Sequence, residues 1–93
     1  MVTGTVEIDF AIHDAQSLKE KRSVMKRLIT RTKNKFNVSV AEVDHLDLRQ
    51  SAKIGIATVS NDRRHANSTL DQVINFIEDM HLVDITHIEM NFY

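Results

Sequence analysis

The stretch SLKEKRSVMKRLITRTKNKF, residues 17–36, decides the fold because it predicts a helix between two strand-like segments. Ser17, followed three positions later by Glu20, forms a capping box, which marks the start of a helix. Mostly apolar residues then recur at spacings of three, four and seven and form one core-facing stripe: Leu18, Met25, Leu28, Ile29, Thr32 and Phe36. We expect Asn37 to end this helix in the left-handed conformation.

The segments on both sides of this helix follow β patterns. Residues 2–12 alternate between apolar and polar side chains, which is typical of a strand with one covered face. Residues 38–43 predict a second strand, and alternation resumes at Ala52 after the polar segment 44–50, so these two strands form a hairpin. Residues 83–93 are rich in β-branched and aromatic side chains and predict the last strand.

A second helix is predicted between the third and fourth strands. Asn61 and Asp62 can cap its start. Its apolar residues fall at helical spacing: Ala66, Leu70, Val73, Ile74 and Ile77. The order β-α-β-β-α-β in 93 residues predicts one α+β domain, residues 1–93, with a ferredoxin-like split βαβ sandwich. In that fold a four-stranded antiparallel sheet carries both helices on one face.

Charge is distributed unevenly along the chain. Eight of the twelve basic residues fall within residues 19–35, which contain a single acid, Glu20. That segment carries a formal charge of +7, whereas the rest of the chain, with four basic and twelve acidic residues, sums to −8. The net charge of −1 therefore conceals two opposed regions. A positive field confined to one element attracts polyanions.

Composition narrows the class of protein. The chain is 42% hydrophobic and 27% charged, as in ordinary globular domains. Without cysteine it forms neither disulfides nor thiolate metal sites, which fits a reducing compartment. No export signal is recognisable, and no apolar run approaches the ~20 residues that span a bilayer. We therefore expect a cytoplasmic protein without membrane contact.

Three strings carry a resemblance to a known family. They are SLKEKRS at residues 17–23, FNVSVAEVDH at residues 36–45 and VSND at residues 59–62. In this combination and order, over almost the whole chain, they resemble the YlxP-like family of small bacterial proteins. The resemblance implies a ferredoxin-like fold and a gene often found beside factors for transcription elongation, translation initiation and ribosome maturation. Family members often carry an aromatic residue in the loop after the Asp-His pair, where this sequence has Arg49.

The first predicted helix has two basic edges beside its apolar stripe. One edge consists of Lys19, Arg22, Lys26 and Lys33. The other consists of Arg27, Arg31 and Lys35. A helix about 25 Å long can follow several successive phosphates of an RNA strand. Alternatively, this helix is only solvated, and its basic residues pair with acids elsewhere on the protein. The single acid within the segment cannot neutralise its charge.

We predict phosphate contacts from the exposed basic residues of this helix, extended by one from the hairpin loop: Lys19, Arg22, Lys26, Arg27, Arg31, Lys33 and Arg49. Lys21 faces nearer the core and is a weaker candidate. The outward face of the sheet should lack an aromatic platform for stacking bases, since it consists of Thr3, Thr5, Glu7, Asp9, Lys53, Gly55, Ala57, His87 and Glu89. That face can instead accept a partner protein or a second copy of the chain as a homodimer.

A third set of candidates lies in three loops, residues 12–17, 44–50 and 80–83, which right-handed crossovers place at one end of the sheet. These loops hold His13, Asp14, Asp44, His45, Asp47 and His81. Such side chains can bind a divalent metal or transfer protons, and the candidate metal ligands are His13, Asp44, His45 and Asp47. Alternatively, Asp44 and Asp47 cap turns while His45 supports the hairpin loop.

These observations lead to one expected function and two alternatives. We expect a non-enzymatic protein without cofactor, bound to RNA or to a ribosomal particle during ribosome assembly or translation. The first alternative is a protein-interaction module or homodimer that uses the open sheet face. The second is a small metal-dependent enzyme that uses the histidine and aspartate loops. Glycine motifs for phosphate or dinucleotide binding are absent, because the only glycines are Gly4 and Gly55.

Overall fold

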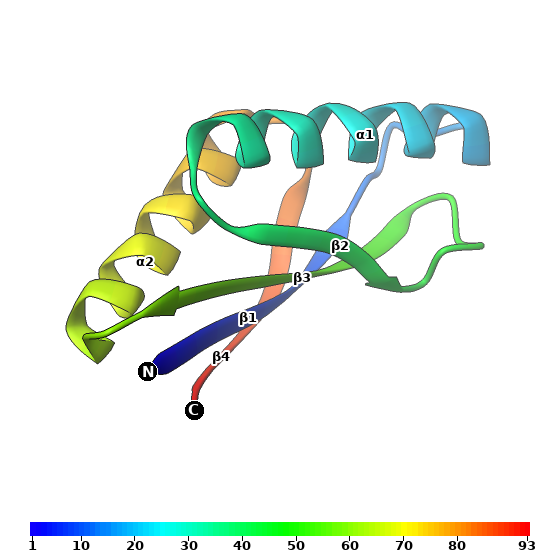
Figure 1. Ribbon diagram of the computed structural model, residues 1–93. Helices are drawn as coiled ribbons and strands as arrows, with labels where there is room; N and C mark the ends of the chain where they lie inside the picture. Colours follow the sequence, from blue (N-terminus) through cyan, green and yellow to red (C-terminus); the bar gives the residue numbers. More distant parts are fainter.

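The computed structural model describes residues 1–93 and has the predicted order of elements. They are β1 (Val2–Ala11), α1 (Leu18–Lys35), β2 (Ser39–Asp44), β3 (Ser51–Ser60), α2 (Arg63–Asp79) and β4 (Asp84–Phe92). The strands form one antiparallel sheet in the order β2-β3-β1-β4. Both helices cover the same face of this sheet (Figure 1). The expected ferredoxin-like sandwich is confirmed.

The core lies between the sheet and the two helices. Alternate residues of β1 and β3 point into it, and Val6, Ile8 and Ile54 are completely buried there. The predicted apolar stripes supply the helical side of the core, with Met25 and Leu28 buried on α1. All five apolar residues predicted to face inward from α2 are buried. Periods of two and of about 3.6 residues therefore place these side chains correctly.

The edge strand β4 contains a bulge that the sequence pattern did not predict. Asp9 of β1 pairs with His87, whereas the next residue, Phe10, pairs with Ile85, so one extra residue, Thr86, is inserted in β4. The Thr86 hydroxyl donates to the Asp9 carbonyl oxygen over 3.2 Å. A bulge reverses the alternation of side chains along a strand. Ile85 before the bulge therefore packs against the core on the same side as Met90 and Phe92 after it, although odd numbers of positions separate them.

Both predicted helix starts are correct, with Ser17 capping α1 and Asp62 capping α2, whereas the predicted end of α1 is wrong. The Ser17 hydroxyl accepts from the Glu20 amide at the start of α1, and the Glu20 carboxylate accepts from the Gln16 amide. The prediction that Asn37 ends α1 in the left-handed conformation is wrong, because Phe36 caps the helix with extended backbone at φ −124°. The left-handed residues are instead His81, which follows α2 and has φ 54°, and His45 in the β2–β3 loop, with φ 61°.

Candidate nucleic-acid interface

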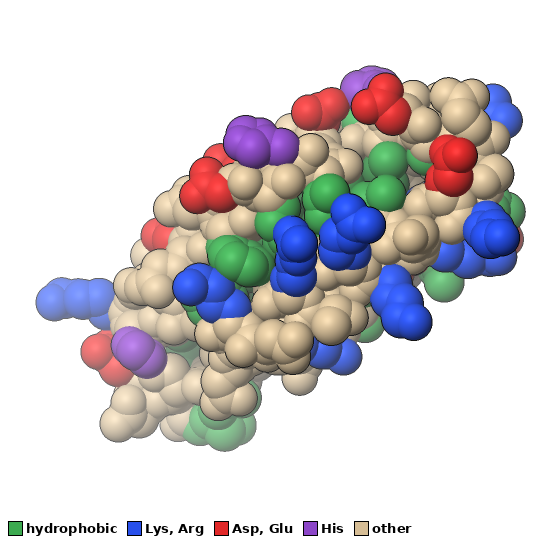
Figure 2. All heavy atoms as spheres, turned by 90° about the horizontal axis from the view of Figure 1, so that it is seen from above, with side chains coloured by type: hydrophobic (Ala, Val, Ile, Leu, Met, Phe, Trp, Pro, Cys, Tyr) green, Lys and Arg blue, Asp and Glu red, His purple; other side chains and the backbone are tan.

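Seven basic side chains of α1 are exposed, and all lack a carboxylate partner. The ion pairs of the protein, defined by an N–O distance of at most 4.0 Å, involve other residues. The seven are Lys19, Arg22, Lys26, Arg27, Arg31, Lys33 and Lys35. In Figure 2, which looks down on the helices, Lys and Arg side chains gather around a hydrophobic patch. The contacts of these seven side chains therefore do not support the alternative in which acids elsewhere on the protein neutralise α1.

The two basic edges of α1 have different surroundings. Arg31 and Lys35 line an open hollow together with Phe76 of α2 and Met80, which follows that helix. On the opposite edge, helical spacing places the side chains of Lys19, Arg22, Lys26 and Lys33 away from α2. The seven side chains therefore form a basic surface along both edges of α1, and only its α2-facing edge borders an aromatic ring.

Lys21 does not belong to this surface, although it contributes to the charge of the segment. Its side chain is completely buried and lies in the middle of the core-facing stripe of α1. The Lys21 Nζ atom lies 2.9 Å from the Glu42 carboxylate on β2 and also donates to the His45 carbonyl oxygen. Lys21 thus ties α1 to β2 and to the hairpin loop, and its charge is compensated internally.

The loop between β2 and β3 is held beside the start of α1. Besides the bond from Lys21, the side-chain amide of Gln50 donates to the carbonyl oxygens of His13 and Ala15, just before the helix. Arg49 is exposed on this loop and has no carboxylate partner. The structure therefore places Arg49 next to the N-terminal end of the basic surface.

The three loops predicted to meet do so, but their histidines and acids are dispersed. A shallow hollow at that end is lined by residues from the β1–α1 and α2–β4 loops, with His13 3.5 Å from the Asp84 carboxylate. His45 instead bonds Ser51 through its ring at 2.9 Å, and its amide donates to the Asp44 carboxylate. These bonds agree with the interpretation that Asp44 caps a turn and His45 supports the hairpin loop, whereas Asp47 makes no side-chain hydrogen bond. No three histidine, aspartate or glutamate side chains are positioned to hold a metal ion together.

The open face of the sheet differs from the prediction at its C-terminal corner. Tyr93 pairs with Thr3 through two backbone hydrogen bonds of 2.9 Å, and the residue is 77% exposed. One aromatic ring therefore lies on a face that we expected to have none. It borders a shallow hollow of about 410 Å³ with Ala41, Val43 and Gly55. The remainder of this face is polar, and Glu7 lies directly opposite Glu89.

Two neighbouring side chains were missed by the sequence analysis. Lys35 was placed on the helix edge but was not chosen as a contact, and Phe76 was not considered. Phe76 falls between the buried positions Ile74 and Ile77, and its place on α2 marks it as a boundary residue between core and solvent. Only the packing of α2 against α1 shows that it lies beside Arg31 and Lys35.

Comparison with known proteins identifies the family. The model of the family described as "Protein of unknown function (DUF503)" matches residues 3–90. The chain belongs to this family. It is also similar to the "Uncharacterized protein YlxP" of Bacillus subtilis (strain 168), with 43% identity over 83 residues that cover 89% of this chain and 90% of the relative. The resemblance inferred from the three sequence strings is confirmed.

Solved structures agree with the fold of this DUF503 member. A de novo designed protein with ferredoxin fold, LFR1 1, superimposes with a TM-score of 0.61 at 18% identity, covering 99% of this chain and 85% of the designed one. LarC2, the C-terminal domain of a cyclometallase, superimposes with a TM-score of 0.53 at 9% identity, covering 100% of this chain and 55% of that one. At such low identities these likenesses concern the fold alone. Neither helix of this chain has the length and apolar character needed to cross a membrane.

Proposed function

We propose that this protein is a non-enzymatic RNA-binding protein of the cytoplasm, which contacts phosphates of a ribosomal particle through α1. The observation that carries the proposal is the group of seven exposed and unpaired basic side chains on one helix. At a rise of about 1.5 Å per residue, the 18 residues of α1 extend over about 27 Å, enough for several successive phosphates.

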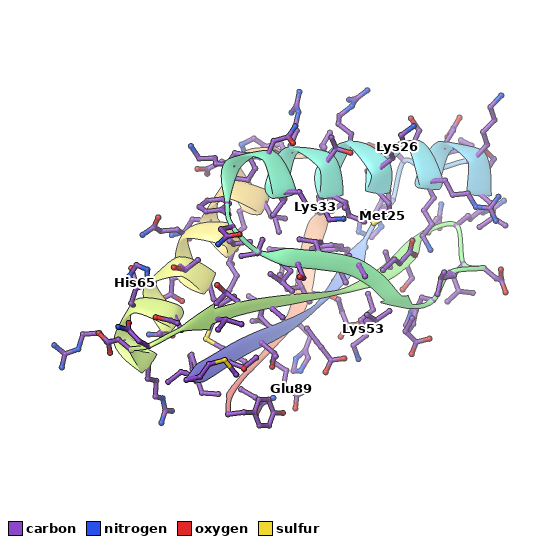
Figure 3. All side chains as sticks on the ribbon, viewed as in Figure 1. Met25, Lys26, Lys33, Lys53, His65 and Glu89 are labelled. Carbon is purple, nitrogen blue, oxygen red and sulfur yellow. The ribbon has the colours of Figure 1, made fainter.

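The distribution of charge over the molecule favours the helical face over the sheet face for an anionic partner. Lys26 and Lys33 extend from α1, whereas Lys53 and Glu89 lie on the other side of the sheet (Figure 3). On that side Lys53 is 4.0 Å from the Asp9 carboxylate, so its charge is already paired. Glu7 and Glu89 add negative charge there. An approaching polyanion would therefore be oriented toward α1.

The start of α1 supports the same proposal. Lys19 and Arg22 stand near the positive end of the helix dipole, where basic side chains are unfavourable and anions are favourable. Only Glu20 offsets them locally. Phosphate groups would relieve this repulsion, and Arg49 from the adjoining loop would contact the same strand. The ribosomal assignment rests on the gene neighbourhood that the family resemblance implies.

Co-sedimentation with ribosomal subunits and their assembly intermediates at increasing salt tests this function. The informative variant is Lys26→Glu/Lys33→Glu on α1. Its matched control is Arg63→Glu/Arg64→Glu at the start of α2, which changes the net charge equally but lies outside the basic surface. We expect salt-sensitive binding that the first variant loses and the control retains. The proposal fails if the native protein stays in the supernatant at low salt or if both variants sediment alike.

A second candidate function, self-association or partner binding through the sheet, is favoured by the hollow on the open face. The hollow is lined mainly by small and apolar side chains, and Val43 and Tyr93 on its rim are 49% and 77% exposed. Analytical ultracentrifugation of the native protein and an Ala57→Lys variant tests it. A dimer that the substitution disrupts would support this function, and a native protein that stays monomeric at high concentration would exclude a homodimer.

A further inference from the structure

The hollow between α1 and α2 combines unpaired cations with an aromatic ring. It is a wide-open surface depression of about 430 Å³, lined by Arg31, Asn34, Lys35, Phe76 and Met80. Phe76 is half-buried, so part of its ring is accessible from outside. No carboxylate lies within ion-pair distance of either cation. The hollow therefore offers apolar surface and positive charge to the same ligand.

Lys35 is held only by weak contacts in this hollow. Its Nζ atom lies 5.6 Å from the centre of the Phe76 ring and 6.0 Å from that of Phe36. The two rings pack edge to face with centroids 5.5 Å apart, an arrangement that fixes the orientation of Phe76. Cation–π contacts at exposed sites are weak, so the flexible Lys35 ammonium can turn to a phosphate while a nucleobase takes its place on the ring.

We propose that this hollow binds an unpaired nucleotide of single-stranded RNA, with its base on Phe76 and Met80 and its phosphate on Arg31 and Lys35. This inference rests on the proposed function and adds to it a preference for single-stranded RNA. Base stacking on an aromatic side chain needs an accessible base face, which a duplex hides. The C-terminal half of α1 would therefore select single-stranded segments, while the rest of the helix contacts phosphates of either form.

A second aromatic ring provides the matched control. Phe92 lies in a hollow near the start of α2, where Arg63 stands 4.8 Å from its ring centre. That hollow also resembles a stacking site, but it contains the carboxylate of Asp62 and does not include any residue of α1. A Phe92→Leu substitution therefore removes a comparable ring from outside the proposed site.

Fluorescence anisotropy with labelled oligouridine and with a blunt RNA duplex of similar charge tests the inference. Phe76→Leu should weaken oligouridine binding about fivefold or more and leave duplex binding unchanged. Phe76→Tyr, which keeps the aromatic face, should bind as the native protein does, and Phe92→Leu should change neither affinity. Circular dichroism verifies that each variant is folded.

The possible outcomes distinguish failure of the stacking site from failure of the proposed RNA-binding function. If the native protein binds RNA and Phe76→Leu binds oligouridine equally well, the stacking site is refuted and the phosphate surface stands. If the native protein binds neither RNA, both are refuted. Nuclear magnetic resonance on the native protein gives a test that needs no variant. Ring protons of Phe76 should shift upfield as oligouridine is added, and unchanged shifts at saturation would overturn the proposal.

Discussion

Substitution of Lys21 by methionine should destabilise the fold. Methionine keeps the apolar stem of this completely buried side chain, but it removes the ion pair with Glu42 at 2.9 Å and the bond to the His45 carbonyl oxygen. Removing one partner of a buried ion pair costs about 3–5 kcal/mol. The Glu42 side chain is 16% exposed and can regain some hydration, so we expect a loss of about 2–4 kcal/mol.

Urea denaturation followed by far-UV circular dichroism measures this loss. The variant Lys21→Met/Glu42→Leu completes the comparison, because replacing both charges by apolar groups leaves no unpaired carboxylate. We expect the double variant to regain at least ~1 kcal/mol relative to Lys21→Met. A Lys21→Met protein as stable as the native one, or a double variant less stable than the single one, would refute the buried ion pair as a fold-stabilising contact.

Three further substitutions change local contacts, and the same denaturation assay measures their effects. Ser17→Ala should lower the free energy of unfolding by about 1 kcal/mol, because the Glu20 amide loses its acceptor; an unchanged midpoint would contradict this. Gly4→Ala should cost about 1–3 kcal/mol, since the added methyl would meet Leu70 at 3.1 Å and Phe92 at 3.2 Å beside α2. Gly55→Ala should cost less, because it meets only Val43 on the open face; the reverse order would be incompatible with the described packing.

Periodicity in the sequence was sufficient for most of the fold. The alternation in residues 2–12 and the helical spacing from Leu18 to Phe36 depend on neighbours that are close along the chain, so they could be recognised without tertiary information. The bulge at Thr86 could not, since no residue there distinguishes an inserted position from regular alternation. The end of α1 was misjudged because asparagine permits a left-handed cap without requiring one.

The candidate site was predictable in its charge but not in its surroundings. Counting basic residues identified the surface of α1, and helical spacing indicated that Lys21 faces inward. Its partner Glu42 lies on another strand and becomes apparent only in the folded chain. The same holds for Phe76, whose value as a stacking surface depends on how α2 packs beside Lys35. Contacts between distant segments were therefore the part that the sequence pattern could not supply.

The salt dependence of RNA affinity is the most direct test of the basic surface on α1. For single-stranded RNA, the slope of log affinity against log salt concentration is about −0.7 per phosphate neutralised. The seven cations of α1 together with Arg49 therefore allow at most about −5.6. We predict a steep negative slope for the native protein and one shallower by about 1.4 for Lys26→Glu/Lys33→Glu, with Arg63→Glu/Arg64→Glu unchanged. A slope near zero, or equal slopes for all three proteins, would contradict the account.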